Sequence, residues 1–112
     1  MDISKGYPKA VIVNIGERVA PNLNRGWLIL SGVILHVTAT PTLVYIISPQ
    51  NAVIFKHAVA SASVSAEYPL FSTLAGDTQA QYSPIIIDGS FNIVVTGDTG
   101  ALVRLLVIEF PM

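Results

Sequence analysis

Short apolar runs rich in β-branched residues constrain the fold of this chain more than any other feature. Val, Ile, Leu and aromatic residues alternate with polar residues or follow one another without a break, and no segment has the i, i+3, i+4, i+7 apolar spacing of a helix. The longest run, Trp27–Ala39, holds Ser31 and Gly32 in its middle, where we expect a bulge or a bend at which a strand passes between sheets. The pattern predicts an all-β protein.

Turn-forming residues divide the runs into strands. Asp88 and Gly89 lie between two apolar runs and are the residue types of a two-residue type I′ turn, which predicts a hairpin. The turn at Gly97–Gly100 leads into the last run, so we expect three consecutive antiparallel strands at the carboxy-terminal end. Further strands are expected at Ala10–Gly16, at Thr42–Ser48, at Ala52–Ala60 after a hairpin turn, and at Tyr68–Leu74 as a short edge strand.

The number and spacing of these strands predict the architecture. A chain of 112 residues suffices for one hydrophobic core, so we expect a single domain over residues 1–112. About eight strands at spacings of roughly 8 to 12 residues are typical of two-sheet folds. The sequence therefore predicts an antiparallel β-sandwich of jelly-roll-like type.

The chain has more apolar residues than one small core can bury. Its hydrophobic fraction is 52% and its charged fraction is 12%, whereas an average soluble domain has roughly 25% charged residues. Several predicted strands are apolar on both sides, although one side is enough for a sandwich core. The surplus side predicts burial against another copy of the chain or another protein, and hence a homo-oligomer.

Candidate interface residues come from these doubly apolar strands. Alternation places residues two apart on the same side of a strand, but it leaves open whether that side faces the core or a partner. Trp27 is expected as a core or interface anchor. Arg104 interrupts an apolar run, and we expect it to pair with Glu67 or Glu109 across a subunit boundary or to face solvent. The predicted interface set is Trp27, Val44, Ile46, Ile85, Ile87, Val103, Arg104 and Leu105.

Charge and patterning exclude several classes of partner. The six Lys and Arg residues are scattered and the formal net charge is −1, so there is no basic patch for nucleic acid. No apolar run reaches the roughly 18 to 20 residues of a membrane-spanning helix. The amino-terminal residues lack a signal-peptide pattern, and we expect no membrane partner. The absence of cysteine excludes disulfides and thiolate nucleophiles and fits assembly in a reducing cytoplasm.

Residue chemistry predicts no catalytic, metal or cofactor site. His36 and His57 have no carboxylate close in sequence, so a cupin-like metal enzyme would need the fold to bring both together with a carboxylate. Asp77, Asp88 and Asp98 each adjoin a glycine, which favours roles in turns and leaves a loop-bound calcium ion as the alternative. The chain has neither a Gly-x-Ser-x-Gly motif nor a phosphate-binding glycine loop, and we do not expect an enzyme.

Several short motifs follow one another in a distinctive order. An RGWLILS segment at Arg25–Ser31 follows a loop, a strand ends at Ser48-Pro49, and PIIIDG at Pro84–Gly89 comes before the GD turn and a terminal LVIE segment at Leu106–Glu109. Over Glu17–Phe110 this arrangement resembles small β-sandwich proteins encoded among the structural genes of tailed bacteriophages.

The resemblance implies a virion subunit, either a capsid-decorating or cementing protein or a head or tail accessory protein. Such a subunit would form a trimer or a ring and would contact a major capsid or tail protein. It would be located in the virion after assembly in the host cytoplasm. The resemblance transfers no functional residues to this chain.

A binding module is the alternative function. Jelly-roll sandwiches often hold carbohydrate sites, and exposed aromatic side chains such as Trp27 or Tyr82 would form a shallow platform for a carbohydrate or a host surface. This alternative predicts that glycans shift the tryptophan fluorescence.

Overall fold

Strands and one short 3-10 helix form the regular structure of the described residues, which are 3–61, 63–70 and 85–112 in the computed structural model. The elements are η1 (Ile3–Lys5), β1 (Tyr7–Asn14), β2 (Arg18–Val19), β3 (Arg25–His36), β4 (Thr42–Ile47), β5 (Val53–Val59), β6 (Ala66–Pro69), β7 (Ile85–Asp88), β8 (Asn92–Thr96) and β9 (Leu102–Pro111). The prediction of an all-β fold is confirmed. The edge strand expected at Tyr68–Leu74 overlaps β6 and otherwise lies outside the described residues.

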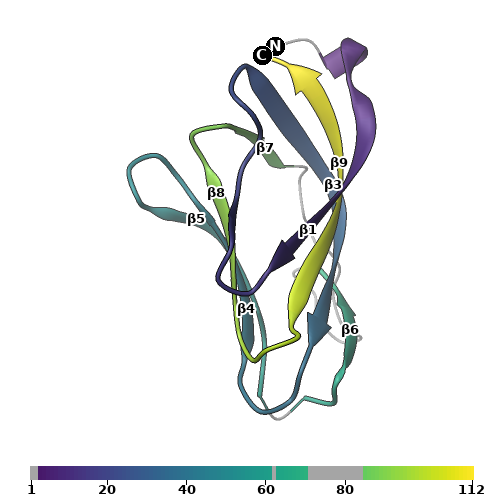
Figure 1. The fold of residues 1–112 in the computed structure, drawn as a ribbon, viewed down its shortest axis with the longest axis vertical. Helices are drawn as coiled ribbons and strands as arrows, with labels where there is room; N and C mark the ends of the chain where they lie inside the picture. The colour runs from purple at the N-terminus through teal and green to yellow at the C-terminus, as the bar shows by residue number, and fades with distance from the viewer. Residues whose placement is uncertain (1–2, 62, 71–84) are drawn as a thin grey trace, which may run out of the picture.

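The strands form two antiparallel sheets that face each other (Figure 1). Sheet A has the order β1-β9-β3, and β6 and β7 both pair with the other edge of β3. Sheet B has the order β2-β8-β4-β5. Because β6 and β7 share one strand position, the eight positions follow the strand order of a jelly roll, and the predicted architecture is confirmed.

The turn at Asp88-Gly89 joins the two sheets, so the predicted hairpin is wrong. The prediction of three consecutive antiparallel strands is wrong for the same reason, because β8 lies in sheet B and β9 in sheet A. β7 pairs with β3 in sheet A, whereas β8 pairs with β2 and β4 in sheet B. The turn runs from Asp88 to Phe91, whose N–H donates to the Asp88 carbonyl at 3.2 Å. A type I′ turn needs positive φ at both central residues, and neither Gly89 nor Ser90 has one. The Asp88 carboxylate instead accepts the Ser90 N–H at 2.8 Å.

The hairpin between β4 and β5 and the bulge in the long third strand are confirmed. β4 and β5 pair antiparallel, and Asn51 in their turn has a φ of 62°. In β3 the register against β9 shifts between Ile29 and Ser31, although β3 stays within sheet A. Gly32 follows the bulge and faces the core, where a Cβ atom would lie 2.7 Å from Leu105 Cδ2.

Alternation along each strand fills the space between the sheets. Inward-facing side chains come from both sheets, and most of them are aliphatic. The core consists of Val11, Val13, Trp27, Ile29, Ile34, Val44, Ile46, Val59, Leu70, Ile87, Ile93, Val95, Val103, Leu105 and Val107. Nothing is left over from this set for a second subunit, because each of these residues is already buried inside one chain.

Candidate interaction surface on sheet A

Most of the predicted interface residues lie in the core. Trp27, Val44, Ile46, Ile87, Val103 and Leu105 are all at most 4% exposed. Their assignment to an interface is therefore corrected, because they have no surface to offer a partner. Ile85 is half-buried and packs against the core, and Arg104 is the one member of the set that is exposed. The pairs predicted by alternation do share one side of their strands, and that side faces the core.

The opposite side of sheet A carries the apolar surplus. We call this surface the outer face of sheet A. Its most exposed apolar side chains are Ile12, Leu30, Ile86 and Leu106, at 56%, 44%, 43% and 44% of their full accessibility. Half-buried apolar side chains lie between them, namely Leu28, Val33, Leu35, Leu102 and Ile108. The register places Ile86, Leu28 and Ile108 in one row across β7, β3 and β9, so the apolar residues are contiguous.

One ion pair lies on this face among the described residues. Arg104 of β9 donates to the Glu67 carboxylate of β6, and both side chains are about half exposed. Glu67 is one of the two partners expected for Arg104, but the pair forms within one chain and not across a subunit boundary, and Arg104 is exposed. A shallow hollow of about 360 Å³ adjoins the pair, bordered by Ala10, Ser31 and Leu106. An exposed ion pair contributes at most about 1 kcal/mol to stability. The pair is therefore a minor contribution to the stability of sheet A.

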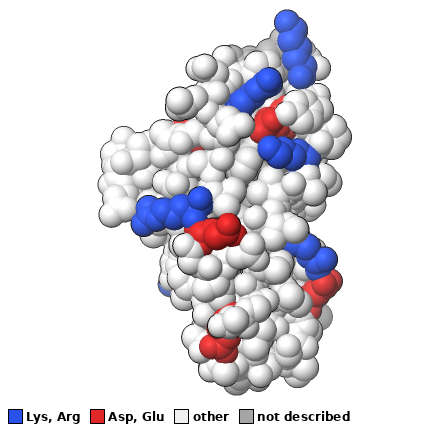
Figure 2. Space-filling model, viewed as in Figure 1, with Lys and Arg blue, Asp and Glu red and all other residues white. Residues whose placement is uncertain are grey.

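The outer face of sheet B combines apolar side chains with two cations: Leu43, Ile47 and Val94 are half-buried there, and Ile54 is 50% exposed. Arg18 lies opposite Val94, Val94 opposite Tyr45, and Tyr45 opposite Lys56 in one row across the sheet. The Lys56 ammonium lies 5.9 Å from the centre of the Tyr45 ring. Figure 2 shows the edge of the sandwich, where charged side chains are sparse and most of the surface is uncharged.

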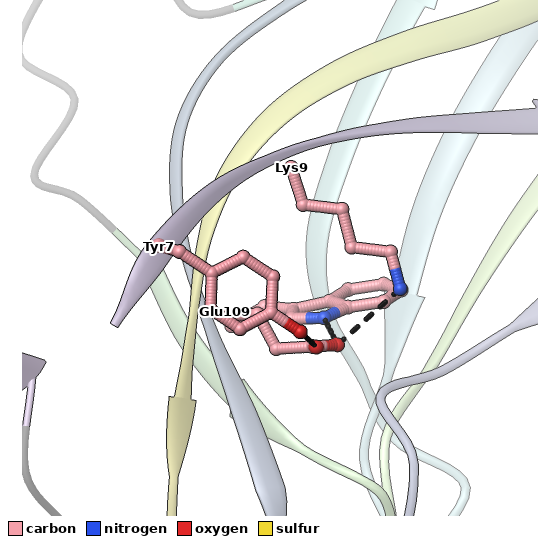
Figure 3. A network of polar contacts seen from close by, with 4 residues as sticks. Tyr7, Lys9 and Glu109 are labelled. Carbon is pink, nitrogen blue, oxygen red and sulfur yellow. Dashed lines mark hydrogen bonds and ion pairs between the residues drawn. The ribbon is translucent and has the colours of Figure 1, made fainter. Parts of the chain in front are cut away.

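A buried carboxylate organises one end of the sandwich (Figure 3). Tyr7, Glu109 and Trp27 lie opposite one another on β1, β9 and β3. Glu109 accepts hydrogen bonds from the Tyr7 hydroxyl, from Trp27 Nε1 at 2.9 Å, and from Lys9 Nζ at 3.4 Å. The Tyr7 and Trp27 hydrogen bonds hold the pKa of Glu109 below its usual value, with a smaller contribution from Lys9.

This network links three neighbouring strands of sheet A, β1, β9 and β3. Glu109 is its one carboxylate, and three donors already occupy it. This network was not predicted from the sequence, in which Glu109 is one of two candidate partners of Arg104. The sequence signal for it is a lone carboxylate in an apolar strand, because a buried carboxylate needs hydrogen-bond donors.

The described residues that were considered for metal binding do not converge. His36 is fully buried on β3, and its Nδ1 lies 2.9 Å from Thr42 Oγ1. His57 is half-buried on β5, where burial lowers its pKa. Asp88 belongs to the turn described above, and Asp77 lies outside the described residues. Within the described ranges, no three His, Asp or Glu side chains are placed to hold one metal ion.

Comparison with protein families, with curated proteins and with solved structures finds no match. In the part of the chain that the structure describes, no helix has the length and apolar character needed to cross a membrane.

Proposed function

We propose that this protein is a structural subunit that assembles with itself through the outer face of sheet A. The observation that carries the proposal is that this face remains apolar although the core between the sheets is complete. Ile12, Leu30, Ile86 and Leu106 are each more than 40% exposed and come from four different strands of one sheet. Single exposed apolar residues are ordinary, but a contiguous apolar face marks an interaction surface.

The proposed setting is the virion of a tailed bacteriophage, as a capsid-decorating, cementing or accessory subunit. The order of motifs between Arg25 and Glu109 supports this setting by resemblance. The jelly-roll strand order supports it by analogy, because viral capsid proteins use this architecture repeatedly. A major capsid or tail protein would then be the further partner.

A carbohydrate-binding module has less support in the geometry. Trp27, one of the two aromatic residues considered for a sugar platform, is 3% exposed and its indole N–H is bonded to Glu109. Tyr82 lies outside the described residues. The described residues offer no other observation that favours a glycan over a protein partner.

The proposal predicts an assembly in solution. Light scattering coupled to size-exclusion chromatography, run over a dilution series, measures the molar mass directly. We expect a mass that is a multiple of the 11.9 kDa subunit. The mass should fall toward that of one subunit as the protein is diluted below the dissociation constant of the interface. A mass of one subunit at every concentration would contradict self-assembly.

A further inference from the structure

We infer that a second copy of the chain covers the outer face of sheet A, packed sheet on sheet about a twofold axis that runs along β3. This inference rests on the proposed function and specifies its contact. It differs from the trimer or ring that the resemblance implies.

The charges on the two outer faces favour a twofold contact through sheet A. Among the described strands, the outer face of sheet A carries charges of both signs, Arg104 and Glu67, whereas the charged side chains on the outer face of sheet B are the cations Arg18 and Lys56. A ring needs two different patches that complement each other, whereas a twofold dimer uses the same patch twice. One self-complementary face is therefore enough for a dimer.

The area of the contact predicts a weak dimer. At about 3.3 Å per residue, the six steps from Leu102 to Ile108 make β9 about 20 Å long, and an axis along β3 overlaps three strand positions of each copy, which are about 14 Å wide, and leaves β1 outside the overlap. The flat area is then roughly 280 Å², and projecting side chains raise the accessible area further. A stable specific interface buries at least about 500 Å² on each partner, so we expect this dimer to dissociate readily on dilution.

The charges on the face are self-complementary about the same axis. Arg104 and Glu67 lie on opposite sides of β3, on β9 and β6, and pair with Val33 and Leu35 respectively. A twofold axis along β3 exchanges these two sides between the copies. Arg104 of one copy then lies over Glu67 of the other, while the apolar side chains of β3 pack against their own counterparts near the axis.

Charge reversal tests this geometry because the two sites are equivalent in a twofold dimer. Arg104→Glu alone places a second carboxylate against Glu67, and Glu67→Arg alone places a second guanidinium against Arg104, both within a chain and across the axis. When the two variants are mixed, like charges remain within each chain, but opposite charges face each other across the interface. Rescue in the mixture therefore reports contacts between chains and not the ion pair inside one chain.

We expect each variant alone to have half the molar mass of the wild type, and the equimolar mixture to regain the wild-type mass as a heterodimer in native mass spectrometry. Variants that keep the wild-type mass separately, a mixture that stays monomeric, or a wild type with three subunits would each overturn the twofold contact while leaving self-assembly intact. A monomeric wild type would instead overturn the proposed function itself.

A second measurement does not depend on charge. The chain has no cysteine, so Ser31→Cys introduces a single thiol on the outer side of β3, close to the proposed axis. A short bismaleimide should link Ser31→Cys subunits into dimers and should link an Ile54→Cys control, on β5 of sheet B, far less. Equal cross-linking of the two variants would contradict an axis along β3.

Discussion

Single residues show which parts of this structure depend on contacts that are distant in sequence. Glu109 is bonded to Trp27, 82 positions away, and to Tyr7, 102 positions away. Composition and alternation indicate that a lone carboxylate in an apolar strand needs a partner, but they do not identify it, because the register between β1, β9 and β3 decides which donors reach it. The sequence likewise leaves Glu67 and Glu109 as two possible partners of Arg104, because the strand register decides which carboxylate lies close to it.

The Glu109 network should stabilise the fold in a pH-dependent way. Glu109→Gln keeps one acceptor oxygen but removes the charge that three donors share, so we expect a loss of about 1 to 3 kcal/mol in the free energy of unfolding at pH 7. The folded pKa of Glu109 is lowered. Its stabilisation is therefore complete above the unfolded pKa of about 4.3 and is lost as the pH falls through the folded pKa.

Urea unfolding of both proteins between pH 7 and pH 3 checks this. The stability difference between wild type and Glu109→Gln should narrow as the pH falls below about 4. Glu17→Gln is the control, since its amide oxygen can still accept the Asn14 N–H that Glu17 accepts at 2.8 Å. A difference that stays constant down to pH 3 would show that Glu109 acts through shape and not through charge.

At the scale of strands, the sequence predicts where a strand forms better than it predicts which side of the strand faces the core. Period-2 patterning identifies β3, β4, β5 and β9 because their apolar runs are long. It does not identify the inward side where three aliphatic residues follow one another, as in β7, since both sides then have the same character. Turn chemistry has a similar limit, because Asp-Gly suits a turn between sheets as well as a hairpin.

The two sides of β7 should respond differently to a charge. Ile87 is 1% exposed in the core, whereas Ile86 is 43% exposed on the outer face of sheet A. Ile87→Asp buries an unpaired carboxylate and should unfold the protein, at a cost of several kcal/mol. Ile86→Asp should leave the circular dichroism spectrum unchanged and lower the molar mass. Two unfolded variants, or two folded ones, would contradict the assigned sides of β7.

The whole molecule is a sandwich with two unlike outer faces. Among the described residues, sheet A presents contiguous aliphatic side chains with one ion pair, and sheet B presents aliphatic side chains together with two cations and an aromatic ring. The amino-terminal helix η1 and the end of β9 lie at one end of the sandwich (Figure 1). Composition alone could predict that an apolar surplus exists, but locating it required the three-dimensional pairing of β1, β9, β3 and β7.

Comparing one outer-face variant with a matched control tests the central claim most directly. Leu106→Glu changes a residue that is 44% exposed on the outer face of sheet A, and Ile54→Glu changes one that is 50% exposed on β5 of sheet B. Light scattering should give a single-subunit mass for folded Leu106→Glu and the wild-type mass for Ile54→Glu. If Leu106→Glu keeps the wild-type mass, or if Ile54→Glu dissociates the assembly instead, the outer face of sheet A is not where the subunits meet.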